Sequence, residues 1–375
     1  MSVLTSIIEP TLLLDREKCQ RNIQKMVEKA QSNGIRLRPH FKTHQSKEVG
    51  EWFQKAGVRS ITVSSLQMAT YFAEQGWDDI TVAFPVNVLE IERINRLANR
   101  IQLNLIVVGL APLAVLAAQL HASVNLWIKI DVGYHRTGVS PDDEESIAAI
   151  LHYIQTQQHL HFKGFLAHAG HSYNCRSHAE ILSIHRESTQ LLTQVAARYR
   201  PAYPDLEISA GDTPTCSVAE DFSMVTEIRP GNFVFYDLTQ ARISSCTKAE
   251  IAVAMACPVV AKHPERQEII VYGGGVHFAK DVLEGGPAPK SYGELVYLEG
   301  QTWSAPVPDC YLSKISQEHG TLKVNPTVFQ QIEVGEVVLI LPVHSCMTAN
   351  AMRRYTTLQG ERLEYLDSHQ EYFIA

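Results

Sequence analysis

The sequence lacks the features that would assign it to a membrane, a secretory pathway or nucleic acid. No stretch approaches the roughly 18 uninterrupted apolar residues of a membrane span. The first ten residues, MSVLTSIIEP, have neither the basic flank nor the long apolar stretch of a secretion signal. A formal net charge of -7, with no run of basic residues, gives no attraction for phosphate backbones. We therefore expect a cytoplasmic protein that binds neither membranes nor nucleic acid.

Cysteine is scarce, and its spacing does not suggest pairing. The 375-residue chain has seven cysteines, an odd number, scattered without paired spacing. This usage fits reduced thiols in a reducing compartment better than a disulfide framework. A cysteine that matters for function should therefore act as a metal ligand or a nucleophile. Low-complexity stretches and linkers rich in glycine and serine are also missing, so we expect domains that pack together.

The first 240 residues alternate short β-branched runs with longer segments whose apolar residues recur every three or four positions. Repeated strand–helix–strand units predict a parallel sheet, and about eight of them close into a (β/α)8 TIM barrel. Nine strands are expected, one more than the barrel needs. They lie at residues 11–15, 35–41, 60–64, 79–84, 103–108, 125–131, 162–168, 206–211 and 226–236.

The pattern changes from about Ser245 onward. Apolar runs joined by turns follow, with few helix-length patterns between them. This part predicts a C-terminal, mostly β domain. We place the barrel domain at residues 10–245 and the β domain at residues 246–375.

A cluster of positive charge surrounds one lysine in the segment GIRLRPHFKTHQSKEVG. Lys42 follows an apolar alternation that predicts a strand, and Arg38, His40, His44 and Lys47 lie beside it in sequence. Nearby cations destabilise an ammonium group, and catalytic groups of barrels lie at the C-terminal ends of strands. Lys42 is therefore a candidate nucleophile. The alternative is a solvated loop lysine among surface or core histidines.

RPHFKTHQS resembles the pyridoxal 5'-phosphate (PLP) attachment segment of the D-serine dehydratase and D-threonine aldolase family, whose fold is that of alanine racemase-like PLP enzymes. The resemblance continues in order along nearly the whole chain. It implies that Lys42 carries PLP as a Schiff base. It also explains the ninth strand, because in this fold the first strand, here residues 11–15, joins the β domain.

Further segments resemble the cofactor-binding stretches of that family. IKIDVGYHRTGV places Arg136 near the cofactor ring, although a buried ion pair with Asp131 is an alternative. FLAHAGHSY ends a barrel strand in the active site of the family. Together with the phosphate-binding segments described next, the resemblance implies cofactor contacts from His40, Arg136, His168, Tyr173, Gly211, Thr213, Gly231, Asn232 and Tyr236.

A phosphate group needs backbone N–H donors and small residues that let them approach. SAGDTPTC and RPGNFVFYD offer both after the last two barrel strands, and they match the phosphate-binding segments of the family. Asp212 departs from the pattern, because a carboxylate would repel a phosphate, so its side chain should point away. YGGGVHF is a weaker phosphate loop, since it is not expected to open a helix and a tight turn explains its glycines.

VVLILPVHSCMT carries a histidine and a cysteine two residues apart at the end of an apolar strand. The period of two would put His344 and Cys346 on one face. An imidazole and a thiolate are good zinc ligands, although a buried cysteine usually serves packing. The resemblance implies that the two residues bind Zn2+ or another divalent metal. Cys346 favours the dehydratase branch, because aldolases tend toward a carboxylate at this position.

The resemblance implies a PLP- and zinc-dependent lyase that acts on a small D-β-hydroxy amino acid. D-serine dehydratase, which forms pyruvate and ammonia by α,β-elimination, is the leading function. The alternatives are a D-threonine or 3-hydroxy-D-aspartate aldolase, a D-threo-3-hydroxyaspartate dehydratase, and a PLP-binding module without turnover. Enzymes of this fold usually complete each active site with a partner subunit. We therefore expect a homodimer in which His344 and Cys346 lie close to Lys42 of one chain or the other.

Overall fold

The computed structural model describes residues 3–286 and 288–366, and it divides the chain into two compact units. The first, here called the sheet unit, comprises Met1–Ile23 and Asn232–Tyr365. The second, the barrel unit, comprises Gln24–Gly231 and Leu366–Ala375. The division falls within helix α1 and directly after Gly231. Among the described residues, no helix has the length and apolar character needed to cross a bilayer.

The barrel unit is built on eight parallel strands in the order β2-β9-β8-β7-β6-β5-β4-β3. The two ends of this order are joined by a parallel bridge between His40 and Thr62. There Phe41 N donates to Thr62 O at 2.8 Å, and Thr62 N donates to Pro39 O at 2.9 Å. The predicted barrel is thus confirmed. Its strands are β2 (Arg36–Leu37), β3 (Ile61–Val63), β4 (Asp79–Pro85), β5 (Gln102–Val107), β6 (Val124–Lys129), β7 (Leu160–Leu166), β8 (Glu207–Ala210) and β9 (Glu227–Ile228).

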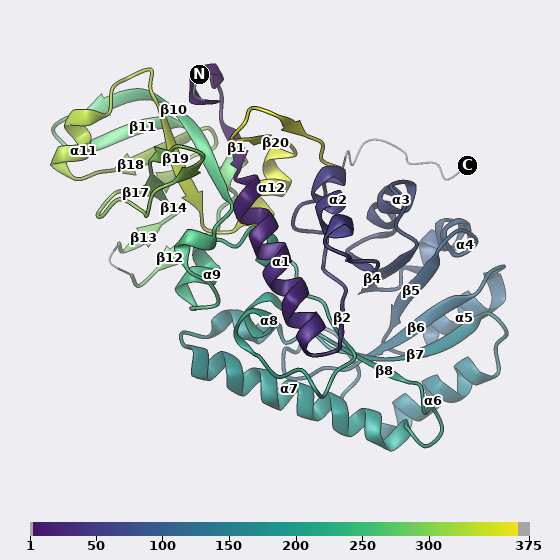
Figure 1. Cartoon of the computed structure of the whole chain (residues 1–375). Coiled ribbons are helices and arrows are strands. Elements are labelled where there is room, and N and C mark those ends of the chain that lie inside the picture. Colours follow the sequence, from purple (N-terminus) through teal and green to yellow (C-terminus); the bar gives the residue numbers. More distant parts are fainter. Residues whose placement is uncertain (1–2, 287, 367–375) are drawn as a thin grey trace. The chain divides into compact units, whose positions relative to one another are not determined.

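Helices connect successive barrel strands and flank them on the outside (Figure 1). Several begin at a polar cap: Ser46, Ser65 and Ser177 each accept a backbone N–H of the first turn. The helices are α1 (Arg16–Ser32), α2 (Lys47–Lys55), α3 (Leu66–Glu74), α4 (Ile91–Ala98), α5 (Ala111–Gln119), α6 (Glu144–Gln155), α7 (His178–Tyr199) and α8 (Thr213–Val218).

A buried ion network links barrel strands near their N-terminal ends. Glu227 accepts hydrogen bonds from Arg36 Nε and Arg38 Nε, both at 2.9 Å, and from Ser209 Oγ at 2.6 Å. Arg38 also binds both carboxylate oxygens of Asp79, at 2.7 and 2.9 Å. Burial raises the pKa of Glu227, but the charges of Arg38 and Arg36 outweigh it and lower the pKa to about 2.

We expect Glu227→Gln to lower the free energy of unfolding by about 3–5 kcal/mol, because it removes one partner of a buried ion pair. The pKa of Glu227 is lower in the folded than in the unfolded state. Its stabilisation is therefore present above the unfolded value and lost as the pH falls from about 4.5 towards 2. Denaturant unfolding at several pH values measures both effects. Glu265→Gln, at an exposed ion pair with Arg266, is the control, and a Glu227→Gln variant that behaves like this control would contradict the prediction.

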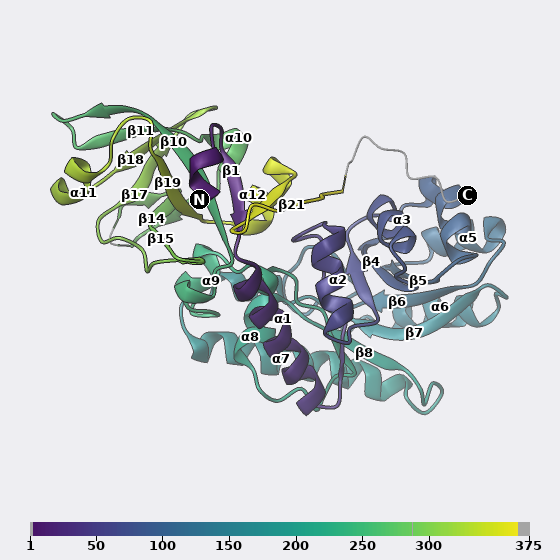
Figure 2. The ribbon, with the colours of Figure 1, turned by 45° about the horizontal axis from the view of Figure 1, so that its top comes forward.

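The sheet unit is built on a nine-stranded sheet in the order β11-β18-β17-β14-β19-β10-β1-β20-β21, and β10 also pairs with β11 (Figure 2). Strand β1 (Thr11–Leu14) pairs antiparallel with β10, as expected for the strand left over from the barrel. Its other strands are β10 (Val253–His263), β11 (Glu268–Tyr272), β14 (Gly293–Val296), β17 (Tyr311–Ile315), β18 (His319–Lys323), β19 (Val337–Pro342), β20 (Tyr355–Thr357) and β21 (Arg362–Leu363).

The sheet unit also contains two short hairpins and four short helices. The hairpins pair β12 (Leu283–Glu284) with β13 (Lys290–Ser291), and β15 (Leu298–Glu299) with β16 (Thr302–Trp303). The helices are α9 (Leu238–Arg242), α10 (Gly275–Phe278), α11 (Pro326–Gln331) and α12 (Ser345–Met352). Helix α10 corrects one expectation, because the segment YGGGVHF does open a helix, although of one turn only.

All seven cysteines are within the described residues, and none of them forms a disulfide. Five of them are buried, whereas Cys246 and Cys346 are partly exposed. Of the seven, these two are therefore the thiols with access to solvent.

Candidate active site

Lys42 lies at the C-terminal mouth of the barrel, where β2 is joined to β3. Its backbone follows the bridge that closes the barrel, and its side chain is exposed. Gln45 Nε2 donates to the Lys42 carbonyl oxygen at 3.1 Å, which fixes the turn after the lysine. No carboxylate forms an ion pair with its ammonium group among the described residues. The amine is therefore accessible for covalent attachment of a carbonyl compound.

Two of the sequence neighbours of Lys42 have other roles. Arg38 is buried in the ion network with Asp79 and Glu227. His44 is buried among aromatic rings, with its ring centroid 4.4 Å from that of Phe41. Burial lowers the pKa of His44 to about 3, so the ring is neutral. Arg38 and His44 therefore do not supply the free positive charge that the sequence pattern suggested.

A group that we call the cationic mouth forms instead from residues distant in sequence: Lys42, Lys129, Arg136 and Arg229. The pKa of His40 is lowered well below its usual value, first by burial and then by the charges of Lys42 and Arg229. Burial likewise lowers the pKa of His168 to about 3, with Lys42 and Arg136 acting in the same direction. Both rings are neutral within a positively charged site, which suits the binding of an anionic ligand.

His168 has a defined tautomer. Its Nδ1 lies 3.0 Å from the carbonyl oxygen of Gly211, which can only accept a hydrogen bond. Nδ1 therefore carries the proton, and Nε2 keeps its lone pair. The ring of Tyr134 packs edge-on against His168, with centroids 5.7 Å apart, and restricts its rotation.

Arg229 and Lys129 were missed in the sequence analysis. Arg229 is buried, and its Nε donates to Ser209 Oγ at 2.6 Å. Lys129 ends β6, and burial followed by the charges of Arg136 and Arg229 lowers its pKa to about 8. A signal for both existed, because each is a charged residue within or directly after an apolar strand run.

Arg136 lies in an exposed loop at the mouth. Its guanidinium carbon lies 4.9 Å from the ring centroid of Tyr134. Asp131 does not pair with Arg136 in the described part of the chain. Its Oδ1 accepts the backbone N–H groups of Gly133, Tyr134 and His135, and its Oδ2 lies 3.1 Å from His135 Nδ1. The alternative of a buried Asp131–Arg136 ion pair is therefore wrong, and Arg136 remains available to a ligand.

The two expected phosphate-binding segments of the barrel unit meet directly. Gly231 N donates to Thr213 Oγ1 at 3.3 Å. A Cβ atom at Gly231 would lie 3.0 Å from His40 Cβ, and one at Gly211, where φ is +146°, would lie 2.6 Å from Arg229 N. Only glycine fits these two positions without displacing their neighbours. This close-packed backbone beside the cationic mouth fits the phosphate of PLP, and the exposed Lys42 fits its aldehyde.

Asp212 caps helix α8 within this region. Its carboxylate accepts hydrogen bonds from Thr215 N and Thr215 Oγ1, both at 2.9 Å, and from Ser172 Oγ at 2.7 Å. Burial raises the pKa of Asp212 to about 6, although hydrogen bonds from Thr215 and Ser172 act in the opposite direction. The carboxylate is thus bound by protein donors, which agrees with the expectation that it turns away from a phosphate.

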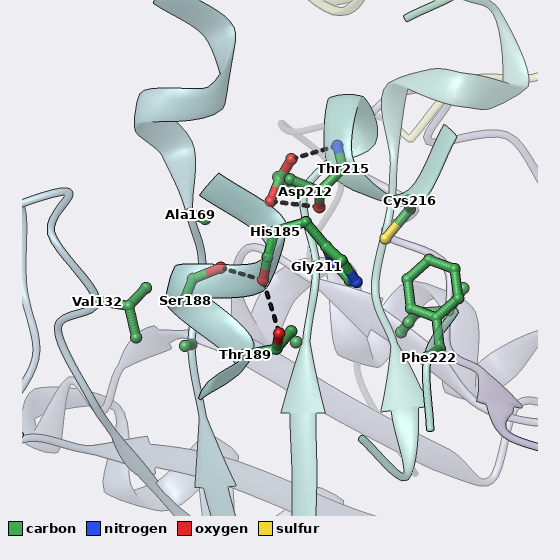
Figure 3. Close-up of a pocket in the computed structure, with 13 residues that line it drawn as sticks. Val132, Ala169, His185, Ser188, Thr189, Gly211, Asp212, Thr215, Cys216 and Phe222 are labelled. Carbon is green, nitrogen blue, oxygen red and sulfur yellow. Dashed lines mark hydrogen bonds between the residues drawn. The ribbon is translucent and has the colours of Figure 1, made fainter. Parts of the chain in front are cut away.

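A cavity is lined by Asp212 and by residues of helix α7 (Figure 3). Its lining includes His185, Ser188, Thr189 and Phe222. His185 O accepts hydrogen bonds from Ser188 Oγ and Thr189 Oγ1. None of the side chains of the cationic mouth lines this cavity, but Gly211 of the first phosphate-binding segment does, so the cavity adjoins the candidate cofactor site.

Two tyrosines with predicted cofactor contacts lie in different units. Tyr173 is in a 3-10 helix, η3 (Gly170–Asn174), which follows β7 in the barrel unit. Tyr236 is buried in the sheet unit and has a left-handed backbone with φ of 49°. Their contact with a cofactor stays a prediction.

Asn232 begins the sheet unit, and its side chain has a role that the sequence did not indicate. Its Nδ2 donates to Asp237 Oδ2 at 2.8 Å, to Ser345 Oγ at 2.9 Å and to Cys346 Sγ at 3.3 Å. The amide thus lies against the sulfur of Cys346, and its two N–H groups are shared among three acceptors.

His344 and Cys346 do lie together, but the geometry expected for them is wrong. Strand β19 ends at Pro342, and His344 is the N-cap of helix α12, whose second residue is Cys346. A side-chain hydrogen bond joins the two residues. The Nδ1 of His344 lies 3.1 Å from Asp281 Oδ1, which leaves Nε2 as the nitrogen that can bind a metal ion.

This donor set fits a metal ion held by two protein ligands. Among residues 3–286 and 288–366, no group of three or more His, Cys, Asp and Glu side chains could hold a metal ion. Imidazole and thiolate are the ligand types that zinc prefers, and two protein ligands leave positions for water or substrate.

The barrel, the exposed lysine at its mouth and the antiparallel sheet unit define an alanine racemase-like PLP enzyme. A model described as "Alanine racemase, N-terminal domain" matches residues 14–238, which is more than half of the chain, and a second, described as "Putative serine dehydratase domain", matches residues 252–358. The chain therefore belongs to the alanine racemase N-terminal domain family.

Named relatives are lyases of similar length. D-threo-3-hydroxyaspartate dehydratase of Delftia sp. (strain HT23) is 29% identical, with 96% of each chain covered. D-serine dehydratase of Dictyostelium discoideum is 27% identical, with 96% of this chain and 95% of the relative covered. D-threonine aldolase of Arthrobacter sp is 24% identical, with 92% and 88% covered. This chain is thus an enzyme, a PLP-dependent lyase.

The solved structure of the Delftia enzyme has a TM-score of 0.89 to this chain, at 28% identity, and covers 97% of this chain and 98% of its own. Two solved variants described as D-threo-3-hydroxyaspartate dehydratase, with TM-scores of 0.90 and 0.89, replace a cysteine and a histidine by alanine at positions two residues apart. The structure of the cysteine variant is described as metal-free.

Proposed function

We propose that this protein is a metal-assisted, PLP-dependent dehydratase of D-β-hydroxy amino acids, with D-serine as the leading substrate. The observation that carries the proposal is the pairing of His344 with Cys346 at the start of α12. A protein that binds PLP without catalysing a reaction would not require two metal ligands such as His344 and Cys346. A cysteine, rather than a carboxylate, at the second position favours dehydration over retro-aldol cleavage.

Two relatives support this choice. Dehydratases are named at 29% and 27% identity over nearly the whole chain. The two variants of D-threo-3-hydroxyaspartate dehydratase change a histidine and a cysteine with the spacing of His344 and Cys346, and the cysteine variant is described as metal-free. We therefore propose that His344 and Cys346 hold a divalent metal, with Zn2+ as the first choice for this donor set.

The reaction removes the Cα proton and the β-hydroxyl of D-serine. PLP, when bound, withdraws electrons from Cα and so makes this proton acidic. Lys42 binds the cofactor and, once released as a free amine, accepts the Cα proton at Nζ. Neutral His40 and His168 line the site without adding charge, while Arg136 and Arg229 bind anionic groups. The products of elimination and hydrolysis are pyruvate and ammonia, with no net change in water.

Hydroxide is a poor leaving group, since the pKa of water is about 15.7. Lewis-acid chemistry from a bound divalent ion would offset the charge that develops as the C–O bond breaks. His344 and Cys346 would hold this ion and leave a position open for the hydroxyl group. This is the role that distinguishes the pair from a structural metal site.

D-threo-3-hydroxyaspartate is the second candidate substrate. It loses the same two groups and differs by a second carboxylate. Lys129 and the exposed Arg136 of the cationic mouth could bind this group, and the Delftia relative is named for this substrate. The aldolase alternative would use the same lysine and metal to break the Cα–Cβ bond.

The proposal is tested by incubating the purified holoenzyme with a panel of D-β-hydroxy amino acids, with and without a chelator. The panel contains D-serine, D-threonine and D-threo-3-hydroxyaspartate, and 2-oxo acid and aldehyde are assayed separately. We expect 2-oxo acid from D-serine, and its loss on chelation. Aldehyde as the main product would show an aldolase, and a preference for the dicarboxylate would identify the second candidate.

We also propose that the protein acts as a homodimer. In the barrel unit, the end of β4 and the 3-10 helix that follows it (Val88–Glu90) expose two large apolar side chains, Phe84 at 61% and Leu89 at 90%. Exposed apolar side chains that lie this close in sequence are typical of interaction surfaces. Sedimentation of the active holoenzyme should give the mass of a dimer, and an active monomer would contradict the proposal.

A further inference from the structure

The glycine-rich segment YGGGVHF has no part in the proposed phosphate site, yet its backbone is tightly constrained. A Cβ atom at Gly274 would lie 2.5 Å from the carbonyl oxygens of Ser316 and Gln317. One at Gly273 would lie 2.5 Å from Cys257 Sγ. The glycines therefore allow this segment to pack directly against the turn between β17 and β18. They fix the course of the chain as it leaves β11.

The segment then turns towards helix α12. Helix α10 ends at Phe278, and Ala279 has a left-handed φ of 64°, which redirects the chain. The Phe278 carbonyl oxygen accepts a hydrogen bond from Thr348 Oγ1 at 3.0 Å. Thr348 is one turn along α12 from His344, and its Oγ1 also lies 3.1 Å from the His344 carbonyl oxygen, so the two carbonyl groups share its single hydroxyl proton. Both ends of this contact are buried, so α10 and α12 are held together.

Asp281 is placed by this arrangement, and its carboxylate Oδ1 lies 3.1 Å from Nδ1 of His344. We propose that Asp281 is a positioning residue for the metal pair: it holds the His344 ring in the tautomer and orientation in which Nε2 binds the metal ion beside Cys346. The inference rests on the proposed metal site. The glycine-rich segment fixes the path of the chain that leads to Asp281. The Asp281 carboxylate thereby lies on the Nδ1 side of the ligand His344.

The physical effect of Asp281 is twofold. A carboxylate that accepts the Nδ1–H fixes the proton there, so the lone pair stays on Nε2 and no ring rotation precedes binding. The negative charge also increases the electron density that Nε2 offers to a cation. Loss of such a partner typically weakens metal binding by about 10–100-fold.

An ordinary surface ion pair is the alternative. The side chains of His344 and Asp281 are 37% and 39% exposed, and exposed ion pairs contribute little to stability. The two interpretations differ in what they predict. A surface pair would leave metal affinity unchanged when it is removed, whereas a positioning carboxylate would not.

The experiment measures binding of Co2+ to the metal-free PLP enzyme by its thiolate charge-transfer absorbance. We expect Asp281→Ala to raise the dissociation constant by about 10–100-fold. Asp281→Asn, which keeps an acceptor oxygen but has no charge, should lie between Asp281→Ala and the native enzyme. The matched control is Glu318→Gln, which removes a carboxylate 3.6 Å from His277 of the same segment. It should bind Co2+ as the native enzyme does, and all variants should keep their PLP.

Each outcome decides one question. Equal Co2+ affinity in the native enzyme, Asp281→Ala and Asp281→Asn overturns the role of Asp281 and leaves the metal site in place. If the native enzyme shows no thiolate band, the proposed metal site itself fails. Should Asp281→Ala not fold, Asp281→Asn decides, and native-like affinity in that variant overturns the inference.

Discussion

Lys42→Ala should abolish covalent PLP binding and turnover of every D-amino acid substrate. The chain would lose the absorbance of the cofactor–lysine linkage, because the amine that forms it is gone. The Cα proton would also lose its acceptor, and the removal of a group that acts in both steps costs many orders of magnitude in rate. Absorbance of the purified protein and a 2-oxo acid assay measure the two effects.

A second lysine of the cationic mouth is an alternative site for PLP attachment. Lys129 also belongs to the cationic mouth, and its pKa is lowered to about 8, mainly by burial, so a fraction of it is a free amine near neutral pH. Borohydride reduction of the native holoenzyme, followed by peptide mapping, separates the two lysines. PLP on Lys129 would overturn the assignment. Lys55→Ala, at the exposed end of α2, is the control and should keep both PLP and activity.

Most barrel strands were predictable because each is an apolar run bounded by turns. The run predicted at 103–108, for example, corresponds to β5 (Gln102–Val107). Two neighbouring barrel strands, β2 and β9, were predicted too long: residues 35–41 and 226–236 contain only the two-residue strands Arg36–Leu37 and Glu227–Ile228. Pro39 and Pro230 explain the difference, because proline has no N–H to donate to a ladder.

The neighbours of Lys42 were less predictable, because closeness in sequence does not determine where a side chain points. His44 packs into an aromatic cluster, and Arg38 turns to Glu227, which is 189 residues away. The cations that do act on the site, Arg136 and Arg229, come from segments that follow other barrel strands. Only the closure of the barrel brings them together.

His344 and Cys346, the proposed metal pair, were predicted only in part. The residue types indicated the chemistry, but the strand geometry assumed for them was wrong. SCMTANAM has no regular apolar pattern and did not predict α12. The helix begins at Ser345 because its backbone N–H is accepted by Asp237 Oδ2 at 3.0 Å, a contact across 108 residues. Such a remote capping group cannot be read from the local sequence.

Cys346→Ala should retain bound PLP but lose elimination from D-serine by orders of magnitude. The cofactor-binding residues that we propose in the barrel unit are unchanged by this substitution. The lost interaction acts mainly in the transition state, where each 1.4 kcal/mol is about a factor of ten in rate. Cys246→Ala changes the other partly exposed cysteine and should retain activity.

D-β-chloroalanine separates the role of the metal from a structural role of the cysteine. Chloride leaves without a Lewis acid, so Cys346→Ala should lose much less activity on this substrate than on D-serine. Equal losses on both substrates would indicate that Cys346 supports the fold or cofactor binding instead. Native activity on D-serine after complete removal of metal would contradict the proposal that a metal ion is needed for loss of the hydroxyl group. If only D-serine is affected, the hydroxyl is the group that needs the ion, and the His344–Cys346 pair is what makes this PLP enzyme a dehydratase.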